Sequence, residues 1–385
     1  MDVLQVKRYF PAGEEPDLKK NMNDVCKFGN CMSELKRIMS EEEWGGMRAS
    51  VFGFLFRLFD NGFSISKVML HHILARQIVT TKKYEMWCMF GRQPLRFSLL
   101  EFRELTGMLC HKDPENIVME GEDQGRFGQL AKKNVTLKDL LDMLSMEGWT
   151  ADDRRRLHYL VIVCGILVPQ EKRRPVEKTY MKLVSNLAEF EATNWGRKSF
   201  VHLLESIHLL DMTQLTKTNY TVHGFILGLR LWAMETISTL GDMFSKFEGS
   251  IPPLGGKWGL YCKRIDNDMV TEIEKSCGIL HYIIPLSTEC SEFEDEVEDA
   301  TVTKMLELLS NNQSLLIGRS TSDDAPTEGR CRSAEETEGN TVMAVSQEEP
   351  QTVSSEGDED FVVQPRPRKK QKNVVIVEDN SVGVP

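Results

Sequence analysis

The sequence has no apolar run long enough to cross a membrane. A membrane-spanning helix needs about 20 consecutive apolar residues, and the longest candidate, residues 157–168, contains His158 and ends at Pro169. The first eight residues also lack the apolar stretch of a secretory signal. We therefore expect neither a membrane protein nor a secreted one.

Cysteine lacks the pattern of a disulfide framework or a zinc site. The nine cysteines are odd in number and irregularly spaced, which favours free thiols in a reducing compartment. Cys26 and Cys31 could supply two metal ligands, but a structural zinc site needs four. Cys110 is expected in the core and its neighbour His111 on the surface. The sequence predicts no metal ion and no cofactor.

Positive charge is not in excess. Residues 291–385 carry 21 acidic and 9 basic residues, a net charge of −12, whereas the whole chain carries −11. Residues 1–290 are therefore near neutral, at +1. This balance disfavours direct DNA binding by the folded part, because such binding needs a basic surface.

Periodicity and capping signals predict a mainly helical domain. Ser40-x-x-Glu43 and Ser98-x-x-Glu101 match the capping box that opens a helix. Residues 157–168 are apolar nearly all round, which predicts a buried central helix. Residues 84–90 alternate in β-favouring residues and predict a strand. Its two predicted faces are Tyr84, Met86, Cys88 and Phe90 on one side and Glu85, Trp87 and Met89 on the other. The predicted fold class is α+β, a predominantly α-helical single domain with a small β-sheet.

Composition divides the chain into three parts. Residues 1–32 are polar and are expected to form an extended N-terminal lead-in; residues 33–290 form the domain, with a loop or insertion at 111–134; residues 291–385 form a disordered acidic tail. Within the tail, Val302, Met305, Leu306 and Leu309 have the spacing of helical turns.

The segment from Ala75 to Cys110 carries a distinctive set of motifs: Arg76-Gln77, Thr81-Lys82-Lys83, an aromatic-rich strand, Gln93-Pro94-x-Arg96-Phe97-Ser98 and a short helix to Thr106-Gly107. With these motifs the segment resembles a family, the plant domain of unknown function nineteen eighty-five. Further matches extend the resemblance over roughly residues 7–240.

The resemblance implies a plant, transposon-derived protein without an established activity. Members often carry a downstream cysteine protease that acts on ubiquitin-like modifiers, with a His, an Asp, an oxyanion Gln and a nucleophilic Cys. Here Cys277-Gly278 follows Lys275-Ser276 and not the expected Asp, and no His-Trp motif precedes it. We expect no catalytic residues and no hydrolase activity.

A basic cluster lies inside the acidic tail, within residues 365–372. Its members are Arg366, Arg368, Lys369, Lys370 and Lys372. An extended basic peptide of this kind is typical of a nuclear-import signal, recognised by the acidic groove of an importin. The alternative is simple charge balance within an acidic segment.

A short aliphatic run follows the basic cluster. Val374, Val375, Ile376 and Val377 precede Glu378 and Asp379. β-Branched residues beside carboxylates have the form of a SUMO-interacting motif, which adds a strand to the edge of the modifier's sheet. The alternatives are an unpaired hydrophobic end or a strand that docks on its own domain.

These features favour a non-enzymatic nuclear protein-interaction module, and the alternative location is the cytoplasm. One alternative is a catalytically dead remnant of a protein from the SUMO-protease family. A DNA-binding protein is a further alternative, opposed by the near-neutral charge of residues 1–290.

Overall fold

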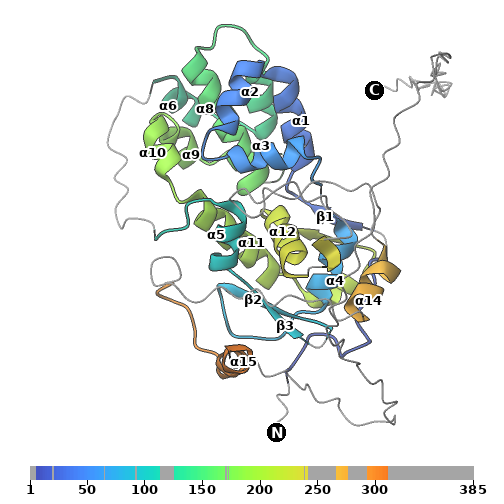
Figure 1. Ribbon diagram of the computed structural model, residues 1–385. Coiled ribbons are helices and arrows are strands. Elements are labelled where there is room, and N and C mark those ends of the chain that lie inside the picture. Colours follow the sequence, from blue (N-terminus) through green and yellow to red (C-terminus); the bar gives the residue numbers. More distant parts are fainter. Residues whose placement is uncertain are drawn as a thin grey trace, which may run out of the picture. The chain divides into compact units, whose positions relative to one another are not determined.

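The computed structural model describes residues 6–19, 21–64, 66–91, 93–112, 125–169, 171, 173–237, 239–241, 266–275 and 293–310 (Figure 1). All of them lie in one compact unit, Met1–Thr321. These described residues are mainly helical and contain two small two-stranded sheets, which confirms the predicted α+β class. No helix in these ranges is long and apolar enough to span a membrane.

The strands form one parallel and one antiparallel pair. β1 (Asn21–Asp24) pairs in parallel with β4 (Asn219–Val222), and β2 (Glu85–Phe90) pairs antiparallel with β3 (Gln93–Ser98). The α-helices are α1 (Phe28–Ile38), α2 (Glu41–Arg48), α3 (Gly53–Asp60), α4 (Lys67–Ala75), α5 (Leu99–Thr106), α6 (Gly125–Ala131), α7 (Leu137–Leu144), α8 (Ala151–Ile162), α9 (Lys178–Leu183), α10 (Leu187–Ala192), α11 (Trp195–His208), α12 (Ile226–Thr236), α14 (Asn267–Lys275) and α15 (Ala300–Ser310). A π-helix, η1 (Val163–Leu167), and a 3₁₀-helix, η2 (Met212–Thr216), complete the order.

Capping boxes start the helices where the sequence predicted them. Ser40 caps α2 with Glu43 as its reciprocal partner, and Ser98 caps α5 with Glu101. Each box satisfies two backbone N–H groups that the first helical turn leaves unpaired. Helix α5 ends at Gly107, whose φ of 66° is the left-handed conformation that glycine adopts without strain.

The predicted central helix is confirmed as α8 continued by η1. Leu157, Leu160 and Ile166 are fully buried. A Cβ placed on Gly165 would lie 2.6 Å from Cys31 Sγ, so the missing side chain allows helix α1 to approach η1 closely.

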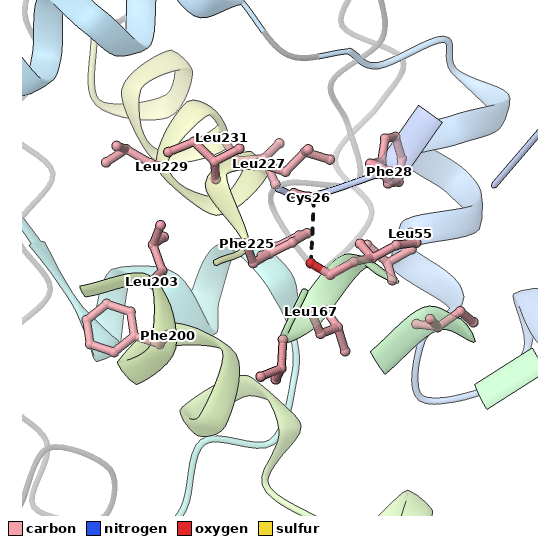
Figure 2. Close-up of a cluster of buried hydrophobic side chains, with 14 of the residues drawn as sticks. Cys26, Phe28, Leu55, Leu167, Phe200, Leu203, Phe225, Leu227, Leu229 and Leu231 are labelled. Carbon is pink, nitrogen blue, oxygen red and sulfur yellow. Dashed lines mark hydrogen bonds between the residues drawn. The ribbon is translucent and has the colours of Figure 1, made fainter. Parts of the chain in front are cut away.

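Distant parts of the chain meet around η1 (Figure 2). Phe28 of α1, Leu55 of α3, Leu167 of η1 and Phe225 before α12 contribute to one buried cluster. Cys26 Sγ donates a hydrogen bond to the carbonyl oxygen of Ile166, at 3.5 Å. Burial raises the pKa of the Cys31 thiol to about 12 and that of Cys26 still further, so both remain protonated core residues at neutral pH.

Strand β2 is buried on both faces. Met86, Cys88 and Phe90 point into the main core, whereas Trp87 and Met89 belong to a second hydrophobic cluster on the opposite face. This confirms the predicted alternation over Met86–Phe90. An alternating strand usually has one apolar face and one polar, solvent-exposed face. In β2 both faces are apolar, because helix α15 covers the second one.

Two segments differ from the predicted domain plan. Part of the expected N-terminal lead-in forms β1 and the start of α1, and Met22, Cys26 and Phe28 are buried. The polar strand Asn21–Asp24 is held by pairing with β4, which leaves no alternating apolar pattern to detect. Part of the expected insertion at 111–134 forms α6, in which Phe127 and Leu130 are buried. The predicted domain boundaries themselves stay a prediction.

Residues 293–310 also differ from the prediction, which places them in the disordered tail. They fold onto the domain, and the helical spacing of Val302 and Met305 is confirmed in α15. The acidic composition of residues 291–385 as a whole predicts disorder. The helical spacing is confined to a short part of that range, so the average composition does not reveal it.

A buried ion pair joins the hairpin to α5. Arg96 Nη2 donates to Glu101 Oε1 at 2.7 Å, and the two side chains are only 1% and 0% exposed. Glu101 Oε2 also accepts hydrogen bonds from the backbone N–H and the hydroxyl of Ser98. Trp232 Nε1 of α12 donates to the Arg96 carbonyl oxygen at 2.7 Å. The ion pair therefore links β3 to α5, and the Arg96 backbone links β3 to α12.

We expect Glu101→Ala to lower the free energy of unfolding by about 3–5 kcal/mol, because it leaves a buried guanidinium without its carboxylate. The exposed pair Lys36–Glu41 provides the control: Glu41→Ala should change stability by about 0–1 kcal/mol. Urea unfolding followed by circular dichroism measures both. Equal losses in the two variants would contradict a structural role for the pair.

Candidate protein-docking surface

The outer face of the β2–β3 hairpin holds a segment from much later in the chain. We call residues 293–310 the docked segment. Its counterpart, the docking face, consists of Ile78, Trp87 and Met89 with the loop at 80–84, Lys112 and Arg197. Val302 and Met305 of α15 are buried against Ile78, Trp87 and Met89, and Leu306 and Leu309 pack beside them. Figure 1 shows α15 beside the hairpin.

Asp299 both starts α15 and attaches it to the docking face. Its Oδ1 accepts hydrogen bonds from the backbone N–H groups of Thr301 at 2.8 Å and Val302 at 3.1 Å, as an N-cap does. Its Oδ2 accepts from the Thr81 N–H at 2.7 Å and from Thr81 Oγ1 at 3.1 Å. One carboxylate therefore couples folding of the helix to docking.

The electrostatic environment keeps Asp299 ionised. Burial alone would raise the pKa of this carboxyl, but hydrogen bonds from Thr81, Val302 and Thr301 lower it below its ordinary value. The stabilisation that this carboxylate provides is present above about pH 4 and is lost as the pH falls through the lowered pKa.

Two further backbone N–H groups of the loop at 80–84 bind a second carboxylate. Glu296 Oε1 accepts from the Lys83 N–H and Oε2 accepts from the Tyr84 N–H, each at 3.0 Å. With Thr81, three N–H groups of one short loop are satisfied by the docked segment. Hydrogen bonds to charged acceptors are stronger than neutral ones.

Phe293 lies in a slot between a ring and a guanidinium. Its ring is stacked on Tyr84 with centroids 3.6 Å apart and planes 7° apart. The guanidinium carbon of Arg197 lies 3.8 Å from the Phe293 ring centroid. Because both cannot occupy one face at these distances, the ring lies between them. This aromatic slot combines stacking with a cation–π contact.

Exposed ion pairs surround the slot. Lys83 Nζ donates to Asp295 at 3.0 Å, Tyr84 Oη donates to the same carboxylate at 2.9 Å, and Lys112 pairs with Glu294. Burial and the hydrogen bond to Asp295 raise the pKa of Tyr84 to about 12. These pairs are about half exposed or more and contribute little individually, but they favour an acidic partner.

A separate cleft lies between α11 and the β1–β4 pair. Its volume is about 640 Å³, and His202, Glu205, Ser206 and His223 are among its lining residues. The His223 N–H donates to Ser206 Oγ at 2.8 Å, and His202 Nε2 lies 3.4 Å from the Pro169 carbonyl oxygen. The Ser206 hydroxyl and the His202 ring thus each contact a backbone group of a neighbouring segment.

The site residues predicted from sequence lie outside the described residues. They are Arg366, Arg368, Lys369, Lys370, Lys372, Val374, Val375, Ile376, Val377, Glu378 and Asp379. Cys277 lies outside them as well. Within the described ranges, no group of three potential metal ligands occurs, and Cys110 is buried beside an exposed His111, as predicted.

The docking face was not identified from sequence, although a signal for it exists. Residues 86–90 are apolar without interruption. Such a run indicates a strand buried on both faces, and therefore a second covering element.

Residues 74–206 match the model of a family described as a domain of unknown function (DUF1985). The match confirms the family resemblance, over a shorter stretch than the one expected from the motifs. No curated protein and no solved structure matches the chain significantly. The docking face lies within the matched region and the docked segment lies beyond it.

We expect Asp299→Ala to weaken docking by about 1–3 kcal/mol, because it removes an N-cap and the bonds to Thr81. Chymotrypsin cleavage at residues 293–310 under native conditions should then be faster. Glu298→Ala is the matched control, since only the backbone carbonyl of Glu298 binds the docking face. Equal cleavage rates in the two variants would contradict the role of Asp299.

Proposed function

We propose that this protein is a non-enzymatic protein-interaction module that acts in the nucleus. One observation carries the interaction role: the docking face holds a segment about 200 residues away in sequence through side-chain and backbone contacts of a peptide-recognition type.

The composition of these contacts supports recognition of a protein segment. An amphipathic helix lies along an apolar surface, an aromatic ring fills a slot, and charged pairs form the rim. Folded domains bind short helical peptides in this way, with a few buried anchors and a polar periphery.

The C-terminal residues supply the proposed location and further partners. In this proposal the basic cluster at 365–372 binds an importin. The run at 374–377 binds SUMO as an added strand, with Glu378 and Asp379 facing a basic rim. No catalytic role is assigned to any residue.

Nuclear import should depend on the basic cluster. We expect a fluorescent fusion, too large to diffuse through nuclear pores, to become cytoplasmic when Arg366, Arg368, Lys369, Lys370 and Lys372 are changed to Ala. The control changes Arg319, Arg330 and Arg332, which are basic tail residues outside the cluster. Imaging in cells measures the distribution. A nuclear signal that survives loss of the cluster would refute its role.

SUMO binding should be weak and should depend on the aliphatic run. Ordering four residues costs roughly 4–8 kcal/mol, and burying three aliphatic side chains returns about 4.5–9 kcal/mol. In an NMR titration of labelled SUMO with a peptide covering residues 372–381, Val375→Ala with Ile376→Ala should abolish shifts along the edge strand. Lys372→Ala with Asn373→Ala should preserve them. Absence of shifts with the wild-type peptide at millimolar concentration would exclude the motif.

A further inference from the structure

We infer that the docking face is a receptor for aromatic–acidic helical segments of other proteins, and that residues 293–310 are its internal competitor. This inference rests on the proposed interaction function and names the chemistry of the partner. Its starting point is that the docking face and the docked segment make complementary contacts along their whole length.

The order of contacts defines what the docking face recognises. An aromatic ring enters the slot between Tyr84 and Arg197. A carboxylate three residues later binds the Lys83 and Tyr84 N–H groups, as Glu296 does. An Asp six residues after the ring binds Thr81 and caps a helix. Apolar residues nine and twelve positions after the ring face Trp87 and Met89.

Without the docked segment, the docking face would present unsatisfied groups. Three N–H groups would lose their carboxylate acceptors, and Lys83 and Lys112 would lose Asp295 and Glu294. Trp87, which is now 1% exposed, would lose the helix that covers its face of the hairpin. A surface with this combination favours an acidic amphipathic partner. Such a partner supplies acceptors for the N–H groups, carboxylates for the lysines and an apolar face for Trp87.

A single-stranded nucleic acid is the less suitable occupant. A base could stack in the slot, but the apolar strip at Ile78, Trp87 and Met89 matches a helix and offers nothing to a phosphate backbone. The cations at the rim that contact the docked segment are Lys83, Lys112 and Arg197. A peptide is therefore the occupant that we propose.

The docked segment is held weakly enough to be displaced. The side chains of its rim ion pairs are between 51% and 76% exposed, so those pairs are screened by water and salt. Among the α15 side chains that the structure describes, Val302 and Met305 are the fully buried ones. An intramolecular competitor has a local concentration near millimolar and lowers the apparent affinity of a partner in proportion.

The test uses the full chain and a fluorescein-labelled synthetic peptide of residues 291–312, with binding measured by fluorescence anisotropy. A chain carrying Phe293→Ala and Asp299→Ala, in which the docked segment is released, should bind the peptide at least tenfold more tightly than the wild-type chain. Adding Tyr84→Ala and Arg197→Ala to the released chain should weaken binding at least tenfold. Circular dichroism confirms that each variant is folded.

Two peptides provide matched controls. A peptide with Phe293→Ala and Asp299→Ala should not bind, whereas one with Glu298→Ala should bind as the wild type does. A second measurement avoids variants of the chain altogether: saturating unlabelled peptide, added to ¹⁵N-labelled wild-type chain, should shift the amide signals of residues 300–310 toward those of a free segment.

Failure would take recognisable forms. If labelled oligo(dT) binds the released chain and the peptide does not, the docking face recognises nucleic acid and the inference is wrong. If neither binds, the docking face takes up no segment that is supplied as a separate molecule, and the inference is equally wrong. The proposed nuclear import and SUMO binding do not involve this face and are decided by the imaging and NMR experiments above.

Discussion

The buried pair between Arg96 and Glu101 fixes the element on which the rest of the interaction surface depends. It joins β3 to the first turn of α5, and the Arg96 carbonyl oxygen accepts a hydrogen bond from Trp232 of α12. Two charges with almost no exposure tolerate little displacement, because movement would leave them unpaired in the interior. The hairpin is therefore held rigidly against the helices. Strand β2, which pairs with β3, sets the position of Trp87 and of Tyr84, the residue directly before the strand.

Strand β2 lies between two hydrophobic clusters and contributes side chains to both. Cys88 and Phe90 belong to the main core, whereas Trp87 and Met89 belong to the cluster that α15 completes. A two-stranded hairpin alone is marginally stable, and packing on both faces compensates. The outer cluster is much the smaller and is bounded by exposed ion pairs, so its helix can separate while the main core stays intact.

Local signals predicted much of this fold, and long-range partners account for what they missed. The Ser98-x-x-Glu101 spacing located the start of α5, but no local pattern shows that Glu101 also neutralises Arg96 inside the protein. No strand is predicted from the sequence at β3, which contains Pro94. Proline cannot donate a ladder hydrogen bond, but an edge position in a two-stranded hairpin tolerates it. The sequence shows the helical spacing of Val302 and Met305. It does not show that these residues pack against Trp87 and Met89 of β2, because that contact forms only when the chain folds. The predicted import and SUMO motifs remain predictions from sequence.

Native-state hydrogen exchange of the full chain tests most directly whether the docked segment is a separable unit on a rigid platform. The account predicts that amides of α15 exchange through a local opening with a much smaller free energy than amides of β2 and α8, and that added salt lowers only the α15 value. Exchange of α15 amides solely through global unfolding, at the free energy measured for α8, would contradict it.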